Sequence, residues 1–426
     1  MARAALSLLL TAALGAAPAL RAAEPASPVE TYTLEEAQRK AELNSAEVLI
    51  SQHGIIIAEQ RVAEAEIQFL PEVGLQALGT RYNAHYPFAL RPEFRNILLY
   101  PSARDNVFSG QGYVTVPLYE GGRNLNTLRL AQTALKQARA KLDTAKLDVK
   151  AATAKAYYGL LLAQDKLAAT KKVLDALDAA PSRPAGALET LEAEAAASDL
   201  RSTAAQEQRD LDTARLDFLK VLNRELDTPV QVEGTLTSTP ADVDLRRALL
   251  WAAELRPELQ AQTYRAAMDA IGVSLALQRR NPSVLLGLDY ELTGQTFPLK
   301  QNNWDATVGV RLPFTLDLWA QHTEKLSEQR QSEVRRSELR DQVYLEVREA
   351  YNDLMHWQQE WPRREKEVQR LEELLRKADL APGSASWLKA ESLVLAARKQ
   401  VLEAVAAHAV ARARLERAVG RALPTG

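Results

Sequence analysis

The sequence predicts a mainly α-helical protein with a small β part, built as a duplicated unit of two helices, two strands and two further helices. Three observations predict this class. Apolar residues change from a period of two to a helical period within residues 114–126. The helical tracts are very long, and their Ala, Leu, Glu, Lys, Arg and Gln residues keep a heptad spacing. The order of elements in the first half of the chain then recurs in the second half.

The change of period marks a corner between a strand and a helix. Residues before it alternate between two unlike faces, as in a strand. From Leu128 onward the apolar residues are three and four positions apart, which predicts a helix over 123–178. At about 1.5 Å per residue this helix would be roughly 80 Å long. Pro117, Gly121 and Gly122 mark the corner, because proline cannot donate to a sheet ladder and glycine permits unusual backbone angles.

The first repeat spans residues 24–222. Thr33 followed by Glu36 has the form of a capping box, and it starts a short helix that precedes a longer one. The other predicted elements of this repeat are strands at 73–82 and 107–117 and long helices at 123–178 and 187–222.

The second repeat spans residues 243–420 and follows a predicted linker at 223–242. Leu34 recurs 211 positions later as Leu245, in the same local pattern. The predicted elements are strands at 283–292 and 304–313 and helices at 319–379 and 386–419, with Pro313 at the second corner and a tail at 421–426.

A short turn joins the two long helices of each repeat. In the first repeat the turn contains Pro181, Pro184 and Gly186, and in the second it contains Pro382 and Gly383. Proline and glycine both interrupt helices, so these residues mark the tip of each helix pair.

The chain begins with a predicted signal peptide at 1–23, which has a basic start, an apolar centre and a small-residue cleavage site ending at Ala19 or Ala23. No later stretch of 18 apolar residues predicts a transmembrane helix. The chain has no cysteine, which excludes thiol chemistry and a lipid attached through cysteine.

Composition and motifs give no indication of an enzyme. The net charge of -2 gives no reason to expect nucleic acid as a partner. The five histidines are scattered and none has a metal-ligand spacing, and Gly110-Gln-Gly112 lacks the context of a nucleotide site. We therefore expect no catalytic residue, cofactor or metal.

The four strands require self-association. Four strands with one apolar face cannot close a barrel or cover their own edges, whereas three chains would supply twelve strands. All four have the length and alternation of strands in a closed membrane barrel. The Ala-rich seams favour close packing of helices, and heptads with few aromatic residues suit a tube whose wall is one helix thick.

The chain resembles the TolC-like outer-membrane efflux proteins from about Thr33 to Gly420. The motifs that carry the resemblance are Thr33-Leu-Glu-Glu-Ala37, Leu70-Pro71, Val116-Pro-Leu-Tyr-Glu-Gly-Gly122, Ala156-Tyr157, Gly186 with Leu191-Glu-Ala-Glu194, and Ala418-Val-Gly420. The resemblance implies a homotrimer in outer-membrane lipid that extends into the periplasm, with a twelve-stranded transmembrane β-barrel and a long α-helical barrel. It also implies a periplasmic adaptor protein and an inner-membrane pump, docked at the helical tip.

The tip provides four candidate pore residues. Some family members narrow the tip with acidic rings after the second turn, where this chain has Ser386 and Lys389. The equivalent residues of the first repeat are Glu189 and Glu192. These two acids either line the pore or favour the helix dipole from the first turn, and Lys389 either faces the pore or lies on a solvated face.

The expected function is a passive exit duct of a tripartite efflux system, opened by helix shifts when its partners bind. Two alternatives remain. One keeps the duct and makes it the outer-membrane part of a type I protein secretion system. The other is a soluble periplasmic coiled-coil scaffold, which leaves the four strands unexplained.

Overall fold

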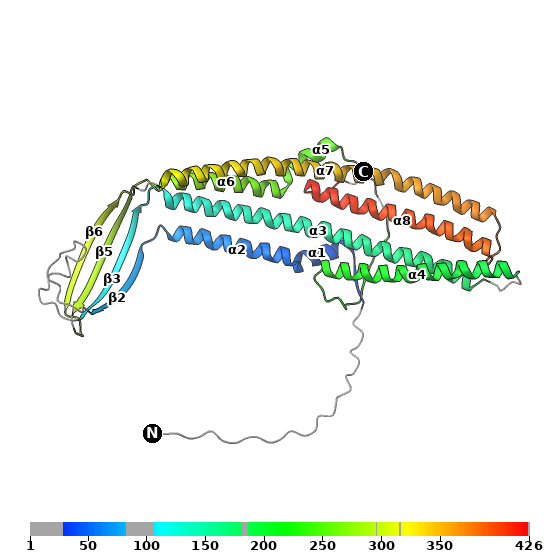
Figure 1. The fold of residues 1–426 in the computed structure, drawn as a ribbon, viewed down its shortest axis with the longest axis horizontal. Coiled ribbons are helices and arrows are strands. Elements are labelled where there is room, and N and C mark those ends of the chain that lie inside the picture. The colour runs from blue at the N-terminus through cyan, green and yellow to red at the C-terminus, as the bar shows by residue number, and fades with distance from the viewer. Residues whose placement is uncertain are drawn as a thin grey trace, which may run out of the picture.

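The computed structural model describes residues 29–81, 106–180, 186–237, 239–294, 296–314 and 317–424. Its described part is elongated, with a sheet at one end and long helices that run to the other end (Figure 1). The predicted signal peptide, Pro181 and Pro184 lie outside the described residues. No helix in the described ranges is both long and apolar enough to cross a membrane.

Each repeat contains the predicted helices and strands, so the fold class is confirmed. The elements of the first repeat are β1 (Glu30–Tyr32), α1 (Leu34–Asn44), α2 (Ala46–Ile67), β2 (Glu72–Arg81), β3 (Asn106–Tyr119), α3 (Arg123–Asp178) and α4 (Ala187–Val221). Those of the second are β4 (Val230–Val232), α5 (Leu245–Leu255), α6 (Pro257–Gln278), β5 (Ser283–Gly294), β6 (Gln301–Arg311), α7 (Leu318–Lys377) and α8 (Ala385–Val419).

The helices begin and end where local chemistry allows. At the start of α1 the Thr33 hydroxyl accepts from the Glu36 amide at 3.4 Å, and the Glu36 carboxylate accepts from the Thr33 amide at 3.1 Å, which completes the capping box. At the end of α8, Gly420 adopts a left-handed conformation with φ of 84°. Corresponding short helices have equal lengths, with 11 residues in α1 and α5 and 22 in α2 and α6.

The main sheet is antiparallel and has the strand order β2-β3-β5-β6. It therefore joins the two repeats through β3 and β5, with Val114 opposite Leu288, and leaves β2 and β6 at its edges. β3 continues beyond Pro117 to Tyr119, which corrects the prediction that Pro117 ends the strand. A register shift between Pro117 and Tyr119 accommodates the proline, since a bulge tolerates a residue that cannot donate.

A second sheet was not predicted. β1 and β4 form a parallel pair, with Thr31 opposite Gln231. The predicted linker at 223–242 therefore contributes a strand to the fold. Three residues are too few to show an alternating pattern, so the sequence contains no periodic signal for this pair.

The helices lie side by side along the length of the molecule (Figure 1). α7 packs against α6 and α8, and α3 packs against α6 and α8 on one side and α2 and α4 on the other. α4 also contacts α8 directly. Two apolar clusters lie midway along the helices, one around Leu160 and Phe218 in the first repeat and one around Leu354 and Leu415 in the second. A smaller cluster of Val173, Leu200 and Leu395 lies further along the long helices.

Candidate pore tip, corners and helix junction

The tip brings together two of the four candidate pore residues. Glu192 lies in the second turn of α4 and Lys389 in the second turn of α8, and their charged atoms are 3.0 Å apart. The two side chains are 44% and 62% exposed, so this ion pair contributes at most about 1 kcal/mol. Glu189 and Ser386 are exposed in the first turns of the same helices.

The tip turn of the second repeat contains a left-handed glycine. In the second repeat, Gly383 has φ of 83°, and a Cβ there would lie 3.1 Å from the Ala180 Cβ. The Ser384 hydroxyl then caps α8 by accepting from the Trp387 amide at 3.2 Å. Pro382 is exposed beside them. Gly186 precedes α4 in an extended conformation, which any residue can adopt.

One pair of opposite charges at the tip is offset within the chain. Lys389 is paired with Glu192, so its charge is offset by an acid of the same chain. Glu189 remains as an exposed acid at the positive end of α4, where the helix dipole favours it.

The first strand-to-helix corner depends on two glycines. Gly121 and Gly122 have φ of 64° and 83°, in the left-handed region that disfavours other residues. A Cβ on Gly121 would lie 2.7 Å from the Asn281 Cβ, and the Asn281 side chain donates to the Gly121 carbonyl at 2.9 Å. The corner therefore also packs the first repeat against the residues that precede β5. Pro313 is half-buried in the second corner, directly after β6.

A buried ionic network joins four helices near the middle of the molecule. Arg256, at the α5–α6 junction, is 2% exposed and forms a two-bond pair with Glu258 at 2.9 Å for each bond. It also contacts Glu346 of α7 at 3.0 Å. Arg417 of α8 contacts Glu346 at 2.9 Å and Asp148 of α3 at 2.7 Å. The network is the most extensive charged cluster among the described residues and links both repeats.

Sequence reasoning missed this network and a second buried pair. Glu207 of α4 and Lys399 of α8 are 2.6 Å apart with side chains only 10% and 15% exposed, and the Thr170 hydroxyl donates to Glu207 at 2.6 Å. Each such residue resembles any other charge on a heptad helix. Only the register between the two repeats, which no local pattern shows, brings these charges together.

Asp165 and His408 are among the residues of the long helices whose pKa values are shifted. Burial raises the pKa of Asp165 in α3. Burial, and secondarily the positive charge of Arg412, lowers the pKa of His408 in α8. Among the residues that the structure describes, no cluster of three histidines and acids is arranged to hold a metal ion.

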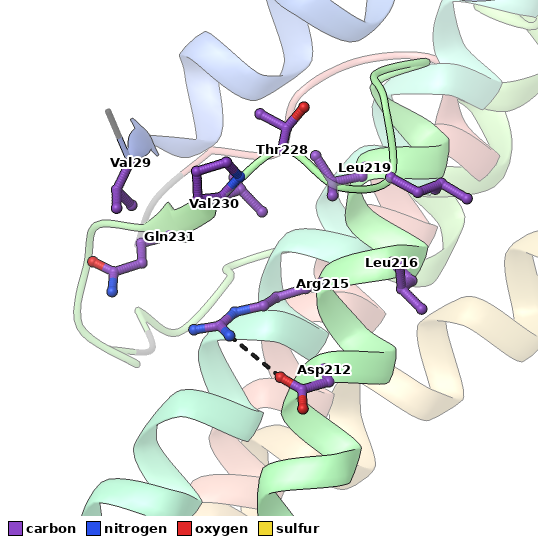
Figure 2. A pocket seen from close by; sticks show the side chains of 10 residues that line it. Val29, Asp212, Arg215, Leu216, Leu219, Thr228, Val230 and Gln231 are labelled. Atoms are coloured by element: carbon purple, nitrogen blue, oxygen red, sulfur yellow. Dashed lines mark hydrogen bonds and ion pairs between the residues drawn. The ribbon is translucent and has the colours of Figure 1, made fainter. Parts of the chain in front are cut away.

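A cavity of about 320 Å³ lies where β4 meets the end of α4 (Figure 2). Leu216, Leu219 and Val230 contribute apolar surface, and Arg215 pairs with Asp212 at 3.3 Å beside them. The cavity is far from the tip and from the corner, and none of the candidate pore residues lines it. We therefore do not assign the function to it.

Comparisons with known proteins agree with this architecture. The family described as outer membrane efflux protein matches residues 37–224. The outer membrane protein VceC of Vibrio cholerae shares the fold with a TM-score of 0.73 and 18% identity, covering 91% of this chain and 96% of that chain. The CmeC outer membrane channel of Campylobacter jejuni has a TM-score of 0.73 and 15% identity, covering 92% and 86%.

A third solved structure is the open state of the Neisseria gonorrhoeae MtrE outer membrane channel, with a TM-score of 0.69 and 18% identity over 91% of this chain and 89% of that chain. No curated protein matches. Residues 37–224 match the family described as outer membrane efflux protein, and the fold of these solved outer-membrane channels is shared over nine-tenths of the chain. Both comparisons point to a TolC-like channel protein rather than to an enzyme.

Proposed function

We propose that three copies of this chain form the exit duct of a tripartite efflux system. The match of residues 37–224 to the outer membrane efflux protein family supports an outer-membrane efflux channel that extends into the periplasm. The sheet supports the assembly of three copies. β2 and β6 are edge strands with exposed apolar side chains, including Leu75 at 91% and Trp304 at 73%. Such edges are stable in lipid only when the sheet closes, and three four-stranded sheets make twelve strands.

The proposed mechanism is a passive conduit. The twelve strands would form the barrel in outer-membrane lipid, and α3, α4, α7 and α8 would form the periplasmic tube. The tip would dock a periplasmic adaptor, through which an inner-membrane pump supplies energy and cargo. Binding of these partners would favour an open packing of the helix pairs over a closed one.

The deciding experiment is the mass of the native particle after outer-membrane fractionation and detergent extraction. We expect a particle of three chains that inserts into planar bilayers and conducts ions. A single-chain particle in the soluble periplasmic fraction would refute the proposal, because the strands would then never close a barrel.

A further inference from the structure

The main sheet has two unlike faces. Its antiparallel register places the side chains of paired residues on the same face, and the face alternates along each strand. One face, named the apolar face, contains the exposed side chains of Leu75, Leu288, Trp304 and Val308. The opposite face, named the polar face, contains every carboxylate of the described strand residues, at Glu72, Asp289, Glu291 and Asp305. The apolar face is therefore the side that the proposed barrel would turn toward lipid.

The hairpin loop between β5 and β6 folds back over the apolar face. This loop lies at the outer end of the sheet, the end far from the helices (Figure 1). A Cβ on Gly294 would lie 3.1 Å from the Leu299 side chain and 3.3 Å from the Thr296 carbonyl oxygen. The ring of Phe297 packs against the ring of Phe108, with 5.0 Å between their centroids. Because Gly294 and Phe108 are partners on the apolar face, the loop bends toward the lipid side of the sheet.

Aromatic side chains continue along this face toward the loop. Tyr290 and Trp304 oppose each other across β5 and β6 and are 49% and 73% exposed. The Asn302 side chain donates to the Tyr290 hydroxyl at 3.3 Å, so the polar end of this tyrosine has a partner on the same face. Phe297 is 72% exposed even though one side of its ring contacts Phe108. Aromatic residues of this kind mark the border between the apolar band of a membrane barrel and the lipid headgroups.

Two basic residues lie at the outer ends of the two edge strands. Arg81 ends β2 on the apolar face, and Lys300 directly precedes β6. Both side chains are exposed, and neither has a hydrogen bond or ion pair with another residue that the structure describes. Arg311, the other base of the described strands, lies on the polar face at the opposite end of β6. Among the described residues, the outer end of the apolar face thus has positive charge and no acid that offsets it.

We propose that this outer end binds a phosphorylated glycolipid of the outer leaflet. Arg81 and Lys300 bind its phosphates, and Phe297 lies among its acyl chains, held in place by the contact with Phe108. The inference rests on the proposed three-chain barrel, in which β6 of one copy lies beside β2 of the next. That closure brings the two basic residues, which lie on opposite edges of one sheet, to neighbouring strands.

The charge pattern favours a lipid with more than one phosphate. An arginine guanidinium donates two parallel hydrogen bonds to a phosphate, and a lysine ammonium supplies a compact positive charge. Because Arg81 and Lys300 lie on different strands, they suit two separate phosphates better than the single phosphate of a two-chain phospholipid. The carboxylates of the polar face lie on the other side of the sheet, where they would face the bore rather than the lipid.

Lipid binding to the extracted particle is the first test. The three-chain particle is stripped of lipid in detergent and titrated with diphosphoryl lipid A, and the bound lipid is counted by native mass spectrometry. A basic residue at an anionic lipid surface contributes about fivefold to affinity, so Arg81→Gln with Lys300→Gln should bind about 30-fold more weakly. Arg311→Gln is the matched control and should leave the affinity unchanged, since Arg311 lies on the polar face. Phosphatidylglycerol should bind the natural chain more weakly than lipid A does.

The depth of the loop is the second test, and the lack of any natural cysteine makes it clean. Phe297→Cys and Asn303→Cys are each labelled with a polarity-sensitive fluorophore and reconstituted into vesicles that contain doxyl-labelled phospholipid. We expect doxyl lipid to quench the label at 297 and iodide in the water to leave it unchanged. The control label at 303 should show the reverse, because Asn303 is exposed on the polar face opposite Glu291.

The outcomes separate a failure of this site from a failure of the assembly. Equal affinity of the double variant and the natural chain for lipid A, in a three-chain particle, would overturn the site and leave the assembly standing. Phosphatidylglycerol bound as tightly as lipid A would overturn the choice of a glycolipid. A label at 297 that iodide quenches and doxyl lipid does not would overturn the placement of the loop. A single-chain particle would overturn the proposed assembly and this inference with it.

Discussion

Arg256→Met tests whether the ionic network around Arg256 contributes to the free energy of unfolding of the protein. Methionine keeps most of the volume and removes the charge, together with the bonds to Glu258, to Glu346 and to the Ala418 carbonyl at 3.1 Å. Removing one partner of a buried ion pair costs about 3–5 kcal/mol. Because Glu258 and Glu346 are 19% and 33% exposed and retain Arg417, we expect about 3 kcal/mol, at the low end of that range.

The assay is guanidinium-induced unfolding of the detergent-solubilised protein, followed by far-UV circular dichroism. Arg414→Met is the matched control, since Arg414 pairs with Glu349 and Asp353 but is 51% exposed. It should cost less than about 1 kcal/mol. Equal shifts of the two unfolding midpoints would refute the argument, because burial would then confer no advantage on the Arg256 contacts.

Three further changes have expected outcomes. Gly121→Ala places a Cβ on a left-handed residue next to Asn281, so it should lower the free energy of unfolding of the extracted particle by about 1–3 kcal/mol, measured by thermal denaturation. The control Gly272→Ala, in the interior of α6, should not lower it. Since the pKa of His408 is lowered in the folded state, the unfolded chain takes up its proton first and stability falls as pH drops below about 6.5. In His408→Leu the free energy of unfolding should no longer show this loss, which is at most about 1.4 kcal/mol per pH unit. Denaturation midpoints of the two proteins, compared between about pH 7 and pH 5, test this. Glu192→Lys should shift single-channel selectivity toward anions, and unchanged selectivity would argue against a pore-lining role.

The sequence predicts the long helices and the main strands because their periodic patterns extend over many residues. Heptad spacing locates α3 and α7, and alternation locates β3 and β5. The corner is predicted from Gly121 and Gly122, since few other signals demand a left-handed backbone. These features are local, and local chemistry is what a single sequence displays.

Features that depend on register between distant segments are not predictable in this way. Asp148 and Arg417 are 269 positions apart, and neither residue alone indicates the other. The β1–β4 pair joins two three-residue strands across 200 positions. The tip lies between these cases: the shift between repeats makes Glu192 and Lys389 counterparts, but only the packing of α4 beside α8 places them 3.0 Å apart.

The apolar clusters pack the middle of each long helix more extensively than its tip end. The clusters around Leu160 and Leu354 hold the middle of the helices, whereas the cluster nearer the tip has only three buried members among the described residues. From Leu167, the last residue of α3 in the cluster around Leu160, α3 extends about 16 Å to its end at Asp178. A tilt of about 10° of this segment displaces its far end by about 3 Å. In the proposed three-chain duct, a displacement of that size in each copy would change the width of the bore at the tip.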